Sequence, residues 1–440
     1  MNNNMKLFKN EAWASVQTDT ITAKTVSHII EDVAKEGDSA VKAYTERFDG
    51  TKLEYLGLSA IDIDERVKPL DPEMKKLIDQ NHDRIMRFAQ FQRAMYRDME
   101  MTTDEDHTLL GQRVIPIDTV GIYVPAGRFP LLSSSLMCII PAKVAGVRRI
   151  VVCTPPGKGK PHPAILYGII KAGATDVFTI GGAQAIAAMA LGTESVPKVD
   201  KIAGPGNKFV NEAKRALFGK VGIDLLAGPS EVLILADGTA IPETVIYDLL
   251  AQAEHDVDAR ACLVTTSEEL AVRVNDRIRT YIETLPTRDI LRISWEAHGC
   301  IAYSPNIETC INFVNEYAPE HLEMHLDSEL LDGVFMKLRN YGSAFLGADA
   351  PVVFSDKLIG TNHVLPTLTA SRYSGGLSVG NFLKVLTYQK IMDKKTSSML
   401  ARYAQRQSDY EGLSAHSASA KLRIIDTEEK GENLASQKEM

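Results

Sequence analysis

Apolar and polar positions follow a regular rhythm from about residue 119 onward. Short apolar runs alternate with longer stretches in which apolar residues recur at helical spacing. The runs that we predict as strands are RRIVVC, TDVFTIG, VDKIAG, SEVLILAD, ARACLVTT, GCIAYS and SAFLG. The helices predicted between them are PHPAILYGIIKAGA, AQAIAAMALG, NKFVNEAKRALF, PETVIYDLLAQAEH, EELAVRVNDRIRTYIETL and ELLDGVFMKLRNY. Strands that alternate with helices in this way predict βαβ units on parallel sheets, and the length suits two such α/β layers.

The two ends of the chain have a different pattern. Before residue 100, SHIIEDVAKEGDSAVKAYTERFDG and DPEMKKLIDQNHDRIMRFAQFQRAM carry apolar residues at helical spacing behind capping residues, which predicts a helical N-terminal part. Beyond residue 375, LSVGNFLKVLTYQ and a helix-like stretch indicate an appended segment. The last residues, DTEEKGENLASQKEM, have the polar composition of a mobile tail.

Composition narrows the class of protein. The 440 residues are 45% hydrophobic and 24% charged, which is typical of a soluble globular protein. The net charge is −8, from 49 basic and 57 acidic residues, and no stripe of lysine and arginine stands out, so nucleic acid is not an expected partner. No signal-peptide core and no membrane-length apolar run is visible, so we predict a cytoplasmic protein without membrane contact.

The five cysteines are odd in number and have no CxxC spacing. They lie in apolar contexts such as LMCII, IVVC and ACLV. We interpret them as buried reduced thiols, so that any metal is expected on nitrogen and oxygen ligands.

Two turns between a strand and a helix could meet an anion. GPGNKFVNEAK begins at Gly204 and would expose free amide groups at a helix start, although a plain turn explains it equally well. No GxGxxG follows a predicted strand, so the usual dinucleotide fingerprint is absent. AGPSEV is a similar turn with Ser230 at its tip.

Several polar side chains could serve a metal or a substrate. Gln252 and His255 lie three apart on one helix face and could share an ion, but a lone helical histidine is more often a surface or satisfied core residue. Asp356, Lys357 and His363 lie in a loop rich in glycine and proline. Glu411 and His416, in EGLSAH, would be a solvated helix end by default.

Glu320 and His321 are two neighbouring proton carriers in NEYAPEHLEMH. They could be ordinary polar surface or a catalytic pair. Neighbouring residues of a strand point to opposite sides, so the two could serve one site only at a turn or a strand mouth. Pro319 predicts such a break, between a helix ending in INFVNEYA and a strand beginning in LEMH, where α/β proteins commonly bind ligands.

Five of these segments, GPGNKFV, AGPSEV, AQAEHD, YAPEHLE and IGTNHVLPT, together resemble the histidinol dehydrogenase family, and the likeness runs from about residue 20 to 424. The resemblance implies Zn²⁺ and NAD as cofactors. It implies zinc ligands at Gln252, His255, Asp356 and His416, with His416 coming from the partner subunit of a domain-swapped homodimer. It also implies Glu320 and His321 as acid–base residues, NAD contacts from Tyr123, Gln184 and Asn207, and substrate contacts from Ser230, His363 and Glu411, with His321 and the zinc ligands beside them.

The reaction that the resemblance implies is the oxidation of a primary alcohol to a carboxylate in two NAD-dependent steps. His321, with an ordinary pKa near 6.5, would accept the alcohol proton at about neutral pH, and Glu320 would help to activate water. SDKLIGTNH departs from the family's GDYASGTNH, because Lys357 replaces an aromatic residue. A cation there favours an anionic substrate, unless Lys357 is merely a solvated loop residue.

Three further stretches, RFAQFQR, GPGNKFVNEAKRALFGKVGIDLLAGPSEV and SRYSGGLSVGNFLKVLTYQ, resemble the sulfopropanediol dehydrogenase branch of the family. This likeness favours 2,3-dihydroxypropane-1-sulfonate, oxidised to 3-sulfolactate in organosulfonate degradation. L-Histidinol is the alternative substrate. A non-catalytic paralogue that only binds a small molecule is an alternative of another class.

The expected fold is α/β, with two Rossmann-like parallel-sheet domains, a helical N-terminal region and a small C-terminal dimerisation segment. We predict an N-terminal arm at 1–20, a first α/β domain with the zinc and catalytic residues at 21–122 plus 230–374, and a second, NAD-binding domain at 123–229. A swapped segment at 375–425 and a flexible tail at 426–440 complete the chain.

Overall fold

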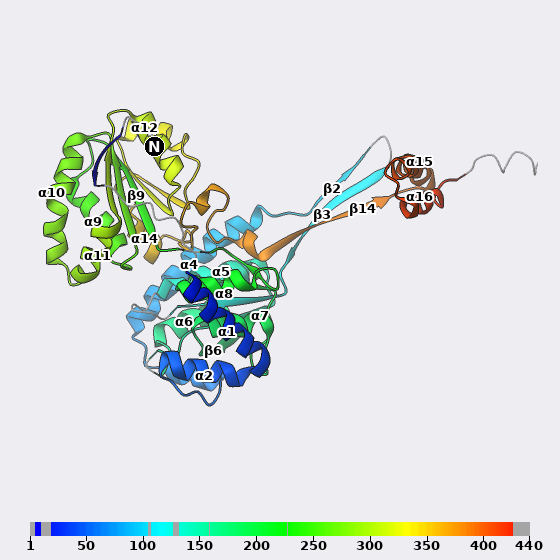
Figure 1. Ribbon diagram of the computed structural model, residues 1–440, viewed down its shortest axis with the longest axis horizontal. Helices are drawn as coiled ribbons and strands as arrows, with labels where there is room; N and C mark the ends of the chain where they lie inside the picture. The colour runs from blue at the N-terminus through cyan, green and yellow to red at the C-terminus, as the bar shows by residue number, and fades with distance from the viewer. Residues whose placement is uncertain are drawn as a thin grey trace, which may run out of the picture. The chain divides into compact units, whose positions relative to one another are not determined.

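The computed structural model describes residues 5–9, 19–103, 107–125, 132–157, 159–226 and 228–425. The chain divides into two compact units, one of Met1–Arg93 with Pro116–Phe382 and one of Ala94–Ile115 with Leu383–Met440. The first unit contains two sheets and the second contains one sheet of three strands (Figure 1).

A six-stranded sheet in the order β1-β11-β10-β9-β12-β13 supports most of the predicted catalytic residues. Its last five strands in that order run parallel, and β1 pairs antiparallel at the edge. The strands are β1 (Lys6–Lys9), β9 (Glu231–Ala236), β10 (Arg260–Thr265), β11 (Gly299–Tyr303), β12 (His321–His325) and β13 (Ser343–Leu346). The helices after them are α9 (Pro242–Ala253), α10 (Glu268–Thr284), α11 (Arg288–His298), α12 (Ile307–Tyr317), α13 (Ser328–Phe335) and α14 (Val352–Lys357).

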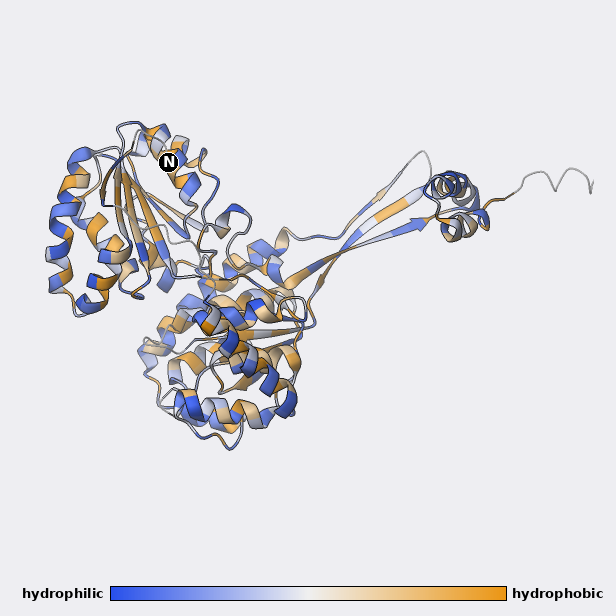
Figure 2. Ribbon diagram, viewed as in Figure 1, coloured by the Kyte–Doolittle hydropathy of each residue, from blue (hydrophilic) through white to orange (hydrophobic). Residues whose placement is uncertain are grey.

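Helices cover both faces of this sheet, so the central strands are apolar on both sides. Val232 and Ile234 of β9 pack into one cluster with α9, α10 and α11. Leu233 and Leu235, which point the other way, pack into a second cluster with α12 and α13. Figure 2 shows these strands as hydrophobic and the outer surfaces of the helices as largely hydrophilic.

A five-stranded sheet in the order β6-β5-β4-β7-β8 has all its strands parallel. Its strands are β4 (Thr119–Tyr123), β5 (Arg149–Cys153), β6 (Asp176–Phe178), β7 (Lys201–Ala203) and β8 (Gly222–Ile223). Its helices are α5 (Leu132–Ala145), α6 (Pro163–Ala172), α7 (Gly182–Leu191) and α8 (Lys208–Leu217), of which α5 packs on α6 and α7 on α8. From β4 the chain adds β5 and β6 toward one edge of the sheet, and it then adds β7 and β8 toward the other edge. The boundary between β4 and β7 is therefore the switch point, where such sheets bind ligands beyond their carboxyl ends.

The helices at the start of the chain are α1 (Thr20–Glu36), α2 (Asp38–Asp49), α3 (Ala60–Val67) and α4 (Pro72–Ala94). The sequence predicts that residues 21–122 belong with the catalytic sheet, and for α1 and α2 this is wrong. Val26, Ile29 and Val33 of α1 share one core with Tyr123 and other residues of the five-stranded sheet. The spacing of these apolar residues predicts a buried face, but it does not identify the partner that covers that face.

The second unit contains a small sheet in the order β14-β3-β2, followed by two helices packed on each other. Its elements are β2 (Met99–Thr102), β3 (Thr108–Pro116), β14 (Leu383–Ile391), α15 (Lys394–Tyr410) and α16 (Ser414–Lys421). The sequence predicts an appended segment at 375–425, but it does not indicate that residues 94–115 join it. The two 3-10 helices η1 (Ala370–Arg372) and η2 (Val379–Phe382) belong to the first unit.

The strands predicted from apolar runs are confirmed as β5, β6, β7, β9, β10, β11 and β13, and LEMH is confirmed within β12. The helices predicted between them are present, although α13 ends at Phe335, well before the end of the predicted stretch. All five cysteines are buried thiols that form no disulfide, as predicted. Within the described parts of the chain, no helix is both long and apolar enough to cross a membrane.

Candidate active site

A polar cavity of about 180 Å³ in the first unit gathers most of the residues predicted to serve the site. These are Ser230, Gln252, His255, Glu320, His321, Asp356, Lys357 and His363. Ser133 and Ser134 of α5, with Pro205 and Gly206 after β7, also line it. The cavity is therefore formed by residues from both sheets of this unit.

Three of the predicted zinc ligands meet at this cavity. Gln252 is buried near the end of α9, His255 lies just beyond it, and Asp356 lies on α14. The His255 Nε2 and Asp356 Oδ2 atoms are 3.9 Å apart. Two ligands that each lie ~2.1 Å from one tetrahedral ion would be about 3.4 Å apart, so a small side-chain adjustment brings these two to a common ion. The donor set suits zinc at this place.

Glu320 and His321 are both anchored to one residue of the neighbouring strand. The Glu320 Oε2 atom accepts a hydrogen bond of 2.8 Å from the amide of Glu231. The His321 Nδ1 atom lies 3.0 Å from the carbonyl oxygen of Glu231 and donates to it. His321 Nδ1 and Glu320 Oε2 are themselves 3.5 Å apart. The pair is thus brought to one site at the break after α12, where Ala318 ends the helix with φ 52°.

The tautomer of His321 follows from this contact. Because Nδ1 carries the proton that is donated to the Glu231 carbonyl, Nε2 of the neutral ring has a free lone pair. His321 Nε2 is buried and has no hydrogen-bond partner among the described residues. A buried base without a partner, in the wall of a cavity, is placed to take a proton from a bound molecule.

The protonation of His321 differs from the expectation. Burial by itself lowers the pKa of the imidazole, but the Glu320 carboxylate and the other partners outweigh it and raise the pKa of His321 to about 9. The sequence predicts an ordinary value near 6.5, which is wrong because it leaves out the adjacent carboxylate. His321 is therefore a stronger base than a free histidine.

The position of the pair in the sheet also differs from the expectation. The sequence predicts the edge where α/β proteins commonly bind ligands, which is the carboxyl end of the strands. His321 is the first residue of β12, opposite Val232 near the start of β9. The predicted catalytic pair thus lies at the amino ends of these strands.

His363 lines the same cavity as a neutral side chain. Its Nδ1 atom lies 3.6 Å from the Asp356 Oδ1 atom. Burial lowers the pKa of His363 to about 4. The preceding residue is anchored, because the Asn362 side chain donates to the carbonyl of Met137. His363 can therefore orient a ligand by a hydrogen bond without carrying charge, whereas the exposed Lys357 supplies a positive charge at the cavity.

A second, larger cavity of about 660 Å³ brings together Tyr123, Gln184 and Asn207, the predicted NAD contacts. Tyr123 ends β4, Gln184 lies in the first turn of α7, and Asn207 caps α8 by accepting from the amides of Phe209 and Val210. Both side-chain polar atoms of Gln184 are buried and unpaired in the described structure. The cavity suits a cofactor in volume, and it lies at the carboxyl ends of the sheet, beside two helix N-termini that favour phosphate.

The glycine turn after β7 requires its glycine and is held by a buried ion pair. Gly204 has φ 117°, and a Cβ there would lie 2.1 Å from the Tyr123 carbonyl oxygen. Asp224 accepts from the Gly204 amide, and Lys214 donates to the Gly204 carbonyl. Lys214 and Asp224 pair at 2.5 Å with both side chains fully buried. The turn therefore has a fixed shape beside both cavities.

Glu411 and His416 lie in the second unit, where both are exposed. Glu411 follows α15 and accepts from the Gln407 side chain, and His416 lies on α16. Their roles in metal and substrate binding stay predictions.

Glu231 is a site residue that sequence patterns do not identify. Its backbone holds Glu320 and His321, and its buried carboxylate accepts from the amide of Leu368. Leu368 and Thr369 both have positive φ, 53° and 67°, which is costly for residues with side chains. Glu231 therefore supports a strained loop beside the cavity. The signal in the sequence was a charged residue at the start of an otherwise apolar strand, SEVLILAD.

The chain thus places a histidine–carboxylate pair in one cavity and has a second cavity of cofactor size at its other parallel sheet. The chain matches the family model described as Histidinol dehydrogenase over residues 13–424. It therefore belongs to the histidinol dehydrogenase family, whose reactions act on CH–OH groups.

Individual relatives agree with this assignment. A histidinol dehydrogenase homolog of Shouchella clausii is 43% identical over 403 residues, which cover 91% of this chain and 94% of that protein. A histidinol dehydrogenase of Geobacillus kaustophilus is 44% identical over 413 residues, or 93% of this chain and 94% of that protein. The crystal structure of histidinol dehydrogenase from Elizabethkingia anophelis superposes with a TM-score of 0.86 at 36% identity and covers 93% of each chain.

Proposed function

We propose that the protein is a zinc-dependent, NAD-linked dehydrogenase that oxidises a small primary alcohol through the aldehyde to the carboxylate, with 2,3-dihydroxypropane-1-sulfonate as substrate and 3-sulfolactate as product. The observation that carries the proposal is the base at His321 Nε2, which is buried and unpaired in the cavity where Gln252, His255 and Asp356 meet. The cavity around Tyr123, Gln184 and Asn207 supports NAD as the hydride acceptor.

The chemistry balances in two steps. The alcohol loses a hydride to NAD and its hydroxyl proton to His321, which gives the aldehyde. His321 releases its proton to solvent, and water adds to the aldehyde with help from the Glu320 carboxylate. The hydrate then loses a second hydride to a second NAD and a proton to the pair, and the resulting carboxylic acid ionises to the carboxylate and releases its proton to solvent. Zinc, when it is bound, would hold the substrate oxygen and polarise it. No cysteine takes part, because the buried thiols have no access to substrate and burial raises the pKa of Cys138 and Cys153 far above neutral.

Lys357 supports an anionic substrate. It is exposed at the cavity that holds the catalytic pair, on the same short helix as Asp356. A sulfonate carries a full negative charge, so an ammonium group placed beside the metal ligands would attract it. Neutral His363 would donate or accept one further hydrogen bond to the same molecule.

We also propose a homodimer in which the second unit is exchanged between subunits. In this arrangement His416 would complete the ligands of zinc and Glu411 would contact the substrate of the other subunit. The exposure of both side chains in the single chain is in keeping with such a role.

A substrate panel tests the proposed reaction. Purified, zinc-replete protein is supplied with dihydroxypropanesulfonate, L-histidinol or simple alcohols, and NADH is followed by its absorbance. We expect two NADH for each sulfonate molecule consumed. One NADH would contradict the second oxidation step. If none of the alcohols yields NADH, the protein is a non-catalytic relative that only binds small molecules.

L-Histidinol is the second candidate substrate, because relatives at 44% and 43% identity are named histidinol dehydrogenase. The Lys357→Met variant separates the two substrates. Loss of a charge-assisted contact is worth roughly 1.5–3 kcal/mol, so the KM for the sulfonate should rise about 10-fold to 100-fold at unchanged zinc content. Lys220→Met, which removes an exposed lysine that does not line the cavity, is the matched control. An unchanged KM together with a much higher kcat/KM for histidinol would favour the second candidate.

A further inference from the structure

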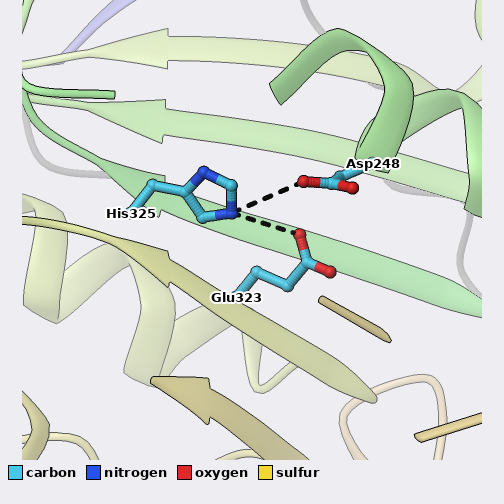
Figure 3. Close-up of side chains that lie close together, drawn as sticks. All are labelled: Asp248, Glu323 and His325. Carbon is cyan, nitrogen blue, oxygen red and sulfur yellow. Dashed lines mark ion pairs between the residues drawn. The ribbon is translucent and has the colours of Figure 1, made fainter. Parts of the chain in front are cut away.

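A second polar cluster lies on the same helix and strand as the proposed active site, but farther toward the carboxyl end of the strand. It consists of Asp248 on α9 with Glu323 and His325 on β12 (Figure 3). One ligand atom of each residue lies within 4.8 Å of those of the other two. The His325 Nε2 atom is 3.5 Å from the Glu323 Oε2 atom and 3.6 Å from the Asp248 Oδ2 atom.

The periodicity of the two elements explains why these residues meet. Every second residue of a strand points to one face, so Glu323 and His325 follow His321 on the side of β12 that faces α9. Asp248 and Gln252 are four residues apart, which puts them on one side of α9, and His255 follows just beyond the end of that helix. The two polar rows therefore face each other. The polar side chains nearer His321 and His255 line the proposed active site. Those at the other end form the buried cluster.

The surroundings of the cluster are apolar. Glu323 lies between Ile234 and Phe345 in the sheet, and both of these are buried. The side chains of Glu323 and His325 are only 2% and 1% exposed, whereas that of Asp248 is 12% exposed and offers a route from solvent. The charges that act on the Asp248 carboxyl are those of Glu323 and His325, and no lysine or arginine is among them.

The polar atoms of the cluster lack hydrogen-bond partners. Asp248 Oδ2, Glu323 Oε2 and both ring nitrogens of His325 are buried without a partner among the described residues. The other oxygen of Glu323 accepts from the amide of Val352, which holds the carboxylate in place and leaves Oε2 pointing at His325. Unpaired buried polar atoms that converge on one point are costly unless a further group binds them.

We propose that Asp248, Glu323 and His325 bind a second divalent transition-metal ion, of the class of Zn²⁺, separate from the ion at Gln252, His255 and Asp356. Ligands about 2.0–2.2 Å from one ion lie about 3.3–3.6 Å apart, which matches the two distances from His325 Nε2, and the two carboxylates lie within 4.8 Å of each other. Two carboxylates and a neutral imidazole balance a +2 ion. The imidazole favours zinc over magnesium or calcium, which prefer oxygen ligands.

Such an ion would join α9 to β12, the two elements that carry Gln252 and His321. Asp248 and Gln252 are four residues apart on α9, or about 6 Å along the helix axis, and none of Asp248, Glu323 and His325 lines the cavity of the proposed active site, so the ion would be structural and would not contact substrate. Without it, the repulsion between the two buried carboxylates remains: burial, and after it the charge of Glu323, raises the pKa of Asp248 to about 7.

Metal content tests the proposal on the full-length protein. The protein is stripped with a chelator, re-equilibrated with Zn²⁺ alone, and analysed by mass spectrometry of its zinc. We expect two zinc ions per chain in the wild type, and one in each of Asp248→Asn and Glu323→Gln. The matched control is His298→Gln, a histidine of the same unit with one carboxylate, Asp258, at 3.8 Å, and it should keep both ions.

An active-site variant keeps this test separate from the proposed function. Asp356→Asn should lose the proposed catalytic ion and retain the ion of the cluster. The zinc content of the variants therefore shows separately whether each of the two sites binds an ion. Crystals soaked in Zn²⁺ provide a measurement without mutation, because anomalous scattering should show a peak between Asp248, Glu323 and His325. Unchanged zinc content in both cluster variants, or no peak in saturated crystals, would overturn the second site and leave a cluster that shares a proton or holds water.

Discussion

The two sheets of the first unit present opposite ends to their cavities. The five-stranded sheet uses its carboxyl ends, where Tyr123 and Asn207 flank the switch point between β4 and β7. The six-stranded sheet uses its amino ends, where His321 begins β12 and Ser230 precedes β9. A cofactor site at carboxyl ends draws on helix N-termini that any such fold provides. The position of the proposed catalytic pair at the amino ends depends on particular contacts, above all those to the backbone of Glu231.

The buried charged residues near the two sheets also differ in how their charges are balanced. Lys214 and Asp224 neutralise each other under the five-stranded sheet and satisfy the backbone of Gly204 as well. Asp248 and Glu323 have only the imidazole of His325 between them, and no lysine or arginine is among the charges that act on Asp248. A buried ion pair whose charges neutralise each other needs no bound ligand. A buried cluster with two carboxylates and unpaired polar atoms indicates that a cation binds there. This contrast is the reason that the further metal site is proposed on one sheet and not on the other.

The largest expected effect comes from removing the base at the amino ends. His321→Gln keeps a polar side chain but cannot accept the substrate proton, so kcat should fall about 10²-fold to 10⁴-fold. Fluorescence titration should show NADH binding unchanged, because the cofactor cavity is on the other sheet. His298→Gln is the control and should keep its activity. A kcat within a few-fold of the wild type would remove His321 from the mechanism.

A large effect on stability is expected at the carboxyl ends. Lys214→Met leaves Asp224 as an unpaired buried charge, so the free energy of unfolding should fall by about 3–5 kcal/mol. Chemical denaturation measures this loss, and Lys220→Met, an exposed lysine, should stay within about 0.5 kcal/mol of the wild type. Adding Asp224→Leu to Lys214→Met should recover part of the loss. If Lys214→Met is as stable as the wild type, the ion pair does not maintain the turn at Gly204.

The smallest effect is a shift along the pH axis. His321 must be neutral to accept a proton, and its pKa is raised to about 9, so log kcat/KM should rise with pH and level off near pH 9. Glu320→Gln removes the carboxylate that raises this pKa, so the rise should end at a lower pH. The quantity to compare is the pH at which log kcat/KM levels off. Its maximum value is expected to fall as well, because Glu320 also serves the second step. A limb that stays near pH 9 in the variant would show that Glu320 does not act on His321.

Local patterns in the sequence determine a large part of this protein. Each apolar run of the βαβ region forms its strand, because a strand buried on both faces needs little besides apolar residues of the right length. The five cysteines are buried because their neighbours are apolar. The motifs that resemble the histidinol dehydrogenase family identify the residues around the two cavities, because those residues stand in short stretches of fixed spacing.

Tertiary structure alone decides which distant segments meet. Nothing in residues 20–36 shows that α1 packs on the five-stranded sheet, since an apolar stripe fits any apolar surface. Residues 94–115 likewise give no sign that they pair with β14. The pKa of His321 and the meeting of Asp248, Glu323 and His325 depend on side chains that lie close together only after folding. Periodicity predicts the face of an element on which a residue lies, but electrostatics and metal binding act over a few ångströms, and the assembled fold sets those distances.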